Sequence, residues 1–290
     1  MAWLQFRLDT SADLAPACEE QLLALGAVAV TLQDNADQPL YDQELGATPL
    51  WQETCVTGLF PASTDTQALW QALPESTQQS ARYRADILED KDWEREWMQH
   101  YKPLQFTEKL WICPSWLEPP DPEAVNIRLD PGLAFGTGTH PTTAMCVRAI
   151  ANLESRHKRV LDYGCGSGVL AIAALLLGAE WAMGVDTAPQ ALVATRNNAQ
   201  NNGITAQQLE VSLPGEPCAP VQLVVANILA GPLCGLAETL CSHLLPGGEI
   251  LLSGILKEQV PDLTAAYSAW LELSVLSEDA GWVVLYGRRQ

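Results

Sequence analysis

Positive charge is scarce in this sequence. Its 290 residues include 16 Lys and Arg against 35 Asp and Glu, a formal net charge of −19. A chain this acidic repels naked DNA or RNA, so we expect no direct contact with nucleic acid. The acidity would attract a basic protein partner, but it equally serves the solubility of a cytosolic protein. The charge alone does not separate these two interpretations.

Paired cysteines and long apolar runs are also missing. None of the eight cysteines stands in C-x-x-C spacing, and most lie inside apolar runs. This pattern argues against a metal site or a disulfide framework and favours buried free thiols. The longest apolar stretch, "VLAIAALLLGA", is about half of a membrane span, and "MAWLQFRLDT" has no basic region followed by an apolar one, so we expect it not to be a signal peptide. We therefore expect a soluble, cytoplasmic protein with no membrane contact.

What the sequence has is the composition of a globular protein, with 48% hydrophobic residues and a length that suggests two domains. Residues 1–89 show the order β-α-β-β-α-β, which is typical of a ferredoxin-like α+β domain. Residues 90–103, "DKDWEREWMQHYKP", predict a linker helix that ends at Pro103, with Trp93 and Trp97 on one face.

Strands and helices alternate through most of residues 104–290, and strands such as "QLVVANI" are apolar without interruption. Such strands are buried on both faces, which indicates an α/β, Rossmann-like domain with a doubly wound, mostly parallel sheet. One helix is predicted over 231–244, and the last two strands, within 272–289, predict an antiparallel hairpin.

The strongest local motif is "LDYGCGSGVLAIAALLLGA", in which a strand ending at Asp162 is followed by Gly164, Gly166 and Gly168. Glycines here allow a sharp turn and close approach of the backbone to a ligand. The next strand ends at Asp186, where a carboxylate can accept both hydroxyls of a ribose. The motif predicts an adenosine-containing ligand, although glycines for packing alone would give the same turn.

The spacing of these glycines bears on which ligand is bound. Dinucleotide sites have G-x-G-x-x-G, whereas here the pattern is G-x-G-x-G and Val169 stands where the third glycine belongs. The Asp162 carboxylate would repel a pyrophosphate and attract an ammonium or sulfonium. S-adenosylmethionine carries both cations and no phosphate, so it is favoured over NAD. An NAD-dependent dehydrogenase remains the alternative from another enzyme class.

Two further segments flank this motif. Asn227 ends a buried strand at the edge of the sheet where ligands bind, so its amide can accept a hydrogen bond from an incoming amine or simply form a turn. The segment "DPGLAFGTGTHPTT" (130–143) has no lysine and the wrong spacing for a phosphate-binding loop. Its Thr142–Thr143 pair is predicted to cap the next helix. His140 is either a base or, more often at such a position, structural.

Together the segments "DPGLAFGTGTHPTT", "DYGCGSGVLAIAALLLGA", "GVD" and "VANILAGPL", with the linker, resemble the PrmA family, which methylates large-subunit ribosomal protein eleven. The resemblance implies a class I, S-adenosylmethionine-dependent methyltransferase with an N-terminal substrate-recognition domain. It implies transfer of methyl groups to the α-amine and to lysines of that ribosomal protein. It also implies these cofactor-binding residues: Phe135, Thr143, Asp162, Gly164, Gly166, Asp186 and Asn227.

Of these, Asn227 is predicted to be catalytic, because it would position the amine. No base is assigned, and Leu133 to Thr139 are predicted to order over the methionine end of the cofactor. A release-factor glutamine methyltransferase is the alternative within the same class. That family has N-P-P-[YF] after the fourth strand, whereas Asn227-Ile228-Leu229 stand here.

Overall fold

The computed structural model describes residues 2–36, 50–88, 101–130, 138–153 and 158–290. The chain divides into two compact units, 1–99 and 100–290, which are considered separately below. The predicted linker helix over 90–103 lies mostly outside the described residues. The predicted division into 1–89, 90–103 and 104–290 therefore stays a prediction.

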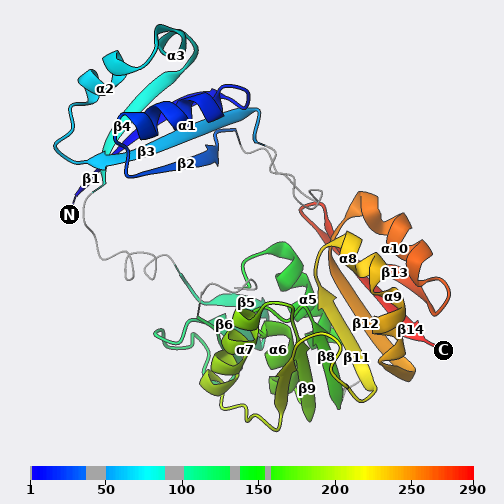
Figure 1. The fold of residues 1–290 in the computed structure, drawn as a ribbon. Helices are drawn as coiled ribbons and strands as arrows, with labels where there is room; N and C mark the ends of the chain where they lie inside the picture. The colour runs from blue at the N-terminus through cyan, green and yellow to red at the C-terminus, as the bar shows by residue number, and fades with distance from the viewer. Residues whose placement is uncertain (1, 37–49, 89–100, 131–137, 154–157) are drawn as a thin grey trace. The chain divides into compact units, whose positions relative to one another are not determined.

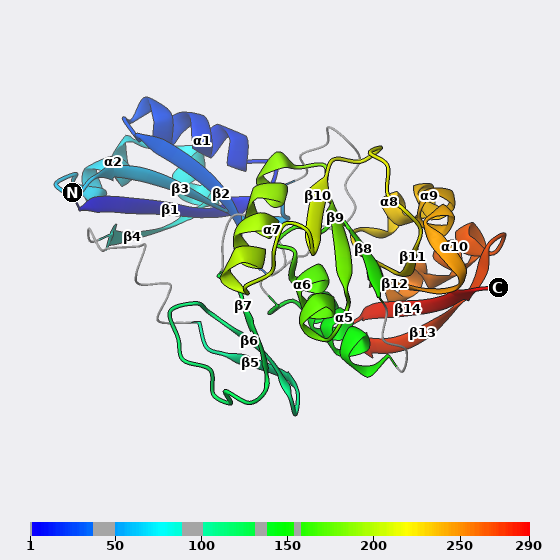
Figure 2. The same ribbon diagram turned by 90° about the horizontal axis from the view of Figure 1, so that it is seen from below.

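The N-terminal unit is an antiparallel sheet with helices on one face (Figures 1 and 2). Its elements follow in the order β1 (Trp3–Ser11), α1 (Ala15–Ala24), β2 (Ala29–Asp34), β3 (Glu53–Pro61), α2 (Thr66–Ala72), α3 (Glu75–Ser80) and β4 (Arg82–Leu88). The sheet order β2-β3-β1-β4 is that of a ferredoxin-like domain, which confirms the predicted fold.

Alternation of side chains along β1 explains how this unit packs. Leu4, Phe6 and Leu8 are buried, whereas the residues between them are partly exposed. The buried face packs on α1, where Leu22 is fully buried. Helix α3 was not predicted, because its sequence "ESTQQS" buries only Thr77 and so has no apolar periodicity.

The C-terminal unit begins with a small sheet of β5 (Leu104–Thr107), β6 (Leu110–Cys113) and β7 (Val125–Arg128). The Asn202 side chain ties this sheet to the rest of the unit, since it accepts from Arg128 N at 2.7 Å and donates to Arg128 O at 2.7 Å. Next come α5 (Pro141–Asn152), β8 (Arg159–Tyr163), α6 (Val169–Leu176), β9 (Trp181–Val185), α7 (Pro189–Asn201), β10 (Leu209–Ser212) and β11 (Val221–Asn227).

The remaining elements complete a seven-stranded sheet. They are α8 (Ala230–Gly235), α9 (Ala237–Ser242), β12 (Leu244–Leu256), the 3-10 turn η2 (Lys257–Gln259), α10 (Val260–Tyr267), β13 (Leu271–Asp279) and β14 (Trp282–Arg289). The order is β10-β9-β8-β11-β12-β14-β13. Strands β8 to β12 pair in parallel, and β14 is antiparallel to both of its neighbours. The doubly wound sheet and the terminal hairpin are confirmed.

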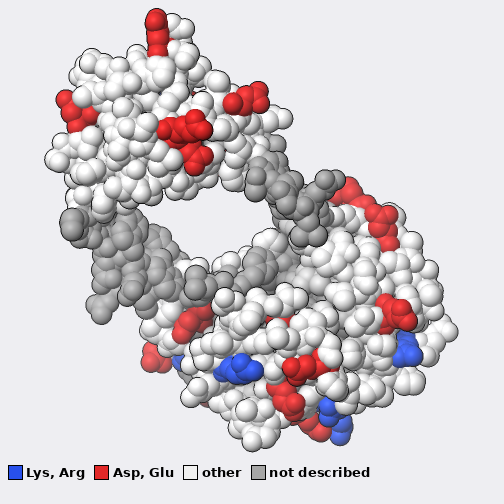
Figure 3. Space-filling model, in the orientation of Figure 1, with Lys and Arg blue, Asp and Glu red and all other residues white. Residues whose placement is uncertain are grey.

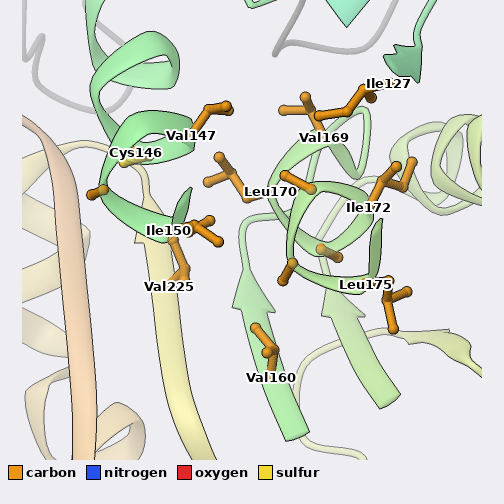
Figure 4. Packing of buried hydrophobic residues seen from close by; sticks show 14 of the residues in the cluster. Ile127, Cys146, Val147, Ile150, Val160, Val169, Leu170, Ile172, Leu175 and Val225 are labelled. Carbon is orange, nitrogen blue, oxygen red and sulfur yellow. The ribbon is translucent and has the colours of Figure 1, made fainter. Parts of the chain in front are cut away.

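Apolar layers on both faces hold this sheet. Figure 4 shows Val147 and Ile150 of α5 and Leu170 of α6 packed over Val160 of β8 and Val225 of β11. A second layer, from α8, α9 and α10, covers the other face. Complete burial of each such side chain contributes about 1.5–3 kcal/mol. The single helix predicted over 231–244 is wrong: the chain breaks into α8 and α9 after Gly235, a residue that disfavours a helix interior.

Candidate functional site

The carboxyl ends of the parallel strands bring the predicted residues to one edge of the sheet. Tyr163 of β8 pairs with Val185 of β9 and with Ala226 of β11, so these three strands end at the same level. Gly164, Asp186 and Asn227 therefore lie on neighbouring strand ends. In doubly wound sheets this edge is where ligands bind.

The glycine loop is held tightly against β9. Gly164 N and Cys165 N both donate to Val185 O, at 2.7 and 3.0 Å. Gly164 has φ +81°, and a Cβ there would lie 2.2 Å from Cγ2 of Ile228. A side chain at this position would meet both backbone strain and a steric clash. Close packing thus explains this glycine independently of any ligand.

A second layer of polar contacts comes from α7. Thr195 Oγ1 donates to Gly166 O at 3.1 Å, and Asn198 Nδ2 donates to Ser167 O at 2.8 Å. Both side chains are buried. Sequence reasoning missed them, although two polar residues three apart on the buried face of a helix were the available signal.

Asp186 faces the loop from the end of β9. Its Oδ2 accepts from Gly166 N at 2.9 Å and its Oδ1 from Ala188 N at 2.9 Å. The residue is only partly buried. Each carboxylate oxygen can accept more than one hydrogen bond, so both retain capacity for ligand hydroxyls. This geometry fits the two hydroxyls of a ribose.

Asp162 lies beneath the loop and is completely buried. Its Oδ2 accepts from Ala171 N at 3.0 Å, whereas Oδ1 has no hydrogen-bond partner among the described residues. Burial raises the pKa of the Asp162 carboxyl to about 7. A nearby cation would favour its ionised form, so the site suits a positively charged ligand better than a phosphate.

Asn227 and Thr143 meet across the site. Asn227 Nδ2 donates to Thr143 Oγ1 at 3.3 Å, although the two residues are 84 positions apart. Thr143 is buried and Asn227 is partly buried. With its amide nitrogen engaged, Asn227 keeps Oδ1 as an acceptor. An amide oriented in this way can accept a hydrogen bond from an amine.

His140 proves to be the cap of α5. Its Nδ1 accepts a hydrogen bond from Thr142 N at 3.3 Å. Its ring packs edge-on against Trp282, with the ring centroids 5.2 Å apart, and burial lowers the pKa of the imidazole. The prediction that Thr142 and Thr143 cap this helix is wrong, because Pro141 already begins it and both threonines lie inside its first turn. These contacts favour a structural role for His140.

Some predictions fall outside the described residues. Phe135 and most of the segment from Leu133 to Thr139 belong to 131–137, so their predicted roles stay predictions. All eight cysteines are free and six are buried, which confirms the predicted thiols. Within the described ranges, no helix is long and apolar enough to cross a membrane, and no cluster of His, Cys, Asp or Glu could hold a metal ion.

Comparison with known proteins gives one consistent result. The family model described as "Ribosomal protein L11 methyltransferase (PrmA)" matches residues 2–290. Proteins named ribosomal protein L11 methyltransferase are 51% identical in Teredinibacter turnerae, covering 100% of this chain and 98% of the relative, and 50% identical in Azotobacter vinelandii, covering 100% of each.

A solved structure agrees with these matches. The crystal structure of ribosomal protein L11 methylase from Lactobacillus delbrueckii subsp. bulgaricus matches with a TM-score of 0.59 and 34% identity, covering 66% of this chain and 100% of that chain. The resemblance found in the motifs is thereby confirmed. The chain belongs to the ribosomal protein L11 methyltransferase family.

Proposed function

We propose that the edge of the sheet formed by the glycine loop, Asp186 and Asn227 transfers methyl groups from S-adenosylmethionine to amines of ribosomal protein L11. The chain is an S-adenosylmethionine-dependent protein methyltransferase, in keeping with its family. The observation that carries the residue assignment is the Asn227–Thr143 contact beside the glycine loop. We further propose that the amines are the α-amine and lysine side chains of the substrate.

The residues present fit this cofactor. Asp186 can accept the ribose hydroxyls, the loop from Gly164 to Gly168 lets the backbone approach closely, and Asp162 supplies negative charge below it. When bound, S-adenosylmethionine supplies a methyl group already activated by the positive sulfur. The protein therefore contributes mainly proximity and alignment.

The role of Asn227 follows from the state that an attacking amine requires. The amine must be neutral, and desolvation at a partly buried site favours the neutral form. Asn227 Oδ1 accepts a hydrogen bond from the amine and directs the nitrogen lone pair toward the methyl group. Thr143 keeps the amide in this orientation.

Substitution of Asn227 tests the assignment. Asn227→Ala should lower turnover by about 100-fold, as expected when a reacting group is misplaced, while affinity for S-adenosylhomocysteine changes little. Thr143→Val, which keeps the amide but removes its partner, should cause a smaller loss. Mass spectrometry of ribosomal protein L11 after incubation with each variant measures the effect. Near-normal methylation by Asn227→Ala would refute the role of Asn227.

The N-terminal unit is proposed to recognise the substrate. Arg7, Arg82 and Arg84 are the bases of residues 1–88, and Arg7 and Arg84 already pair with Asp86 and Asp9 at 3.9 and 2.7 Å. On the face shown in Figure 3, the visible charged side chains of this unit are Asp and Glu. Uncompensated negative charge steers a basic protein toward the enzyme and disfavours nucleic acid.

This electrostatic proposal has a direct test. Raising the salt concentration should raise the KM for the protein substrate more than the KM for S-adenosylmethionine, because screening weakens only the long-range attraction. Equal salt dependence of both would argue against it. We place the reaction in the cytoplasm, where newly made ribosomal proteins are available.

A further inference from the structure

Gly254 of β12 lies against the backbone that follows Asn227. Strand β12 pairs with β11 so that Ser253 stands opposite Asn227, which puts Gly254 beside Ile228. Gly254 has φ +81°, and a Cβ there would lie 2.3 Å from Ile228 O and 2.7 Å from Ile228 C. These are backbone atoms, so no change of rotamer can relieve the contact.

A second glycine lies next to Ile228 on its other side. Strand β11 lies between β8 and β12 in the sheet, and a Cβ on Gly164 would come within 2.2 Å of Ile228 Cγ2. Gly164, which directly follows β8, and Gly254 of β12 therefore flank one residue, Gly164 next to its side chain and Gly254 next to its main chain. A side chain added at either glycine would therefore collide with Ile228.

The strand that carries Gly254 is itself held in place. Ser253 is completely buried, and its Oγ donates to Val283 O of β14 at 2.9 Å. The pairing of β12 with β14 shifts register between Leu252 and Ile255, so Gly254 lies at an irregularity of β12. A side chain added at Gly254 would meet the Ile228 backbone, and we expect Ile228 to shift because β12 is paired on both sides.

We infer that Gly254 is a positioning residue for methyl transfer. By packing on the Ile228 backbone it sets the position of the adjacent Asn227, whose amide must stay against Thr143 to receive the amine. This inference rests on the proposed role of Asn227. It assigns to Gly254 an effect on turnover in addition to any effect on folding.

A matched pair of variants separates contact from backbone strain. Gly281 has the same φ of +81°, but nothing lies within 4 Å of a Cβ added there. Both Gly254→Ala and Gly281→Ala should lose thermal stability through backbone strain, and Gly254→Ala should lose more, because its Cβ also meets the Ile228 backbone. Only Gly254→Ala should lose turnover, by about 10- to 100-fold, with a much smaller change in affinity for S-adenosylhomocysteine. Equal turnover of the two variants would overturn the inference.

Gly254→Asn adds an independent check. Asn tolerates positive φ better than Ala does but carries the same Cβ. Turnover of Gly254→Asn should therefore stay as low as that of Gly254→Ala. Recovery in the Asn variant would show that strain, and not contact with Ile228, caused the loss, and this too would overturn the inference.

A third comparison covers the case in which Gly254→Ala does not fold. Adding Ile228→Ala removes Cγ2 and gives the displaced backbone room on the Gly164 side. The double variant should fold yet turn over at least 10-fold more slowly than Ile228→Ala alone. Equal rates would refute the positioning role. If the unmodified protein and Gly281→Ala also fail to methylate ribosomal protein L11, the proposed function fails and the inference falls with it.

Discussion

Gly168→Ala is the substitution whose effect the structure defines most sharply. Gly168 is the N-cap of α6, with φ +79°, and a Cβ there would lie 2.6 Å from Cγ2 of Thr195. Thr195 is completely buried and holds the glycine loop through Gly166 O. The substitution should therefore destabilise the fold and also loosen the loop that we assign to the cofactor.

The expected magnitude has two parts. Placing Ala in the left-handed region costs about 1–2 kcal/mol. Overpacking against Thr195 adds about 1–3 kcal/mol. Gly203→Ala is the control for the first part, because Gly203 has φ +70° and nothing lies within 4 Å of its added Cβ. The difference in the free energy of unfolding between Gly168→Ala and Gly203→Ala therefore gives the cost of the contact with Thr195.

Thr195→Ser relieves that collision selectively, because it removes Cγ2 and keeps the hydroxyl that binds Gly166 O. The double variant Gly168→Ala with Thr195→Ser should regain about 1 kcal/mol relative to the additive expectation. Urea unfolding measures the change in the free energy of unfolding. Calorimetric titration measures the affinity for S-adenosylhomocysteine, which reports on the state of the glycine loop. If Gly168→Ala behaves like Gly203→Ala and the cycle shows no coupling, packing on Thr195 does not explain this glycine.

Three other predictions concern charge and exposure. Burial raises the pKa of Asp162 from an unfolded value near 3.8 to about 7, so its contribution to stability is greatest below pH 4 and is lost as pH rises to 7. Asp162→Asn should therefore gain in Tm over the unmodified protein between pH 5 and 8, measured by calorimetry, while binding S-adenosylmethionine more weakly; a pH-independent difference in Tm would contradict this. Asp186→Ala should lower cofactor affinity by about 10- to 100-fold through lost ribose hydrogen bonds, with an unchanged affinity disproving the assignment. Because Cys218 and Cys234 are the partly exposed thiols, a thiol reagent should reach these two first in the native protein and all eight after unfolding; rapid reaction of more than two would show the packing to be looser than described.

Sequence pattern was a good guide to elements with strong periodicity. The buried run ending at Asn227 and the glycine loop after Asp162 lie at the edge where the pattern placed them, because apolar strands and glycine turns are local properties. Polar short elements were less predictable. Helix α3 has almost no apolar face, and the break between α8 and α9 depends on a single Gly235.

Contacts between distant segments were harder to foresee. The sequence around Thr143 does not indicate its contact with Asn227, and the polar pair Thr195 and Asn198 does not by itself indicate that its partner is the glycine loop. Each contact depends on helix packing against the sheet, which no short window of sequence specifies. The capping of α5 by His140 shows the same limit, since the predicted Thr cap was locally reasonable.

The place of β14 in the sheet bears on how the chain is made. This strand follows all the others in the sequence, yet it lies between β12 and β13. Until residues 282–289 leave the ribosome, β12 lacks its second neighbour and Ser253 lacks its acceptor, Val283 O. Such long-range pairing is slow to form. A nascent chain can therefore pair β8 with β9 and β11 early, but β12 gains its second neighbour only when synthesis of the hairpin is finished.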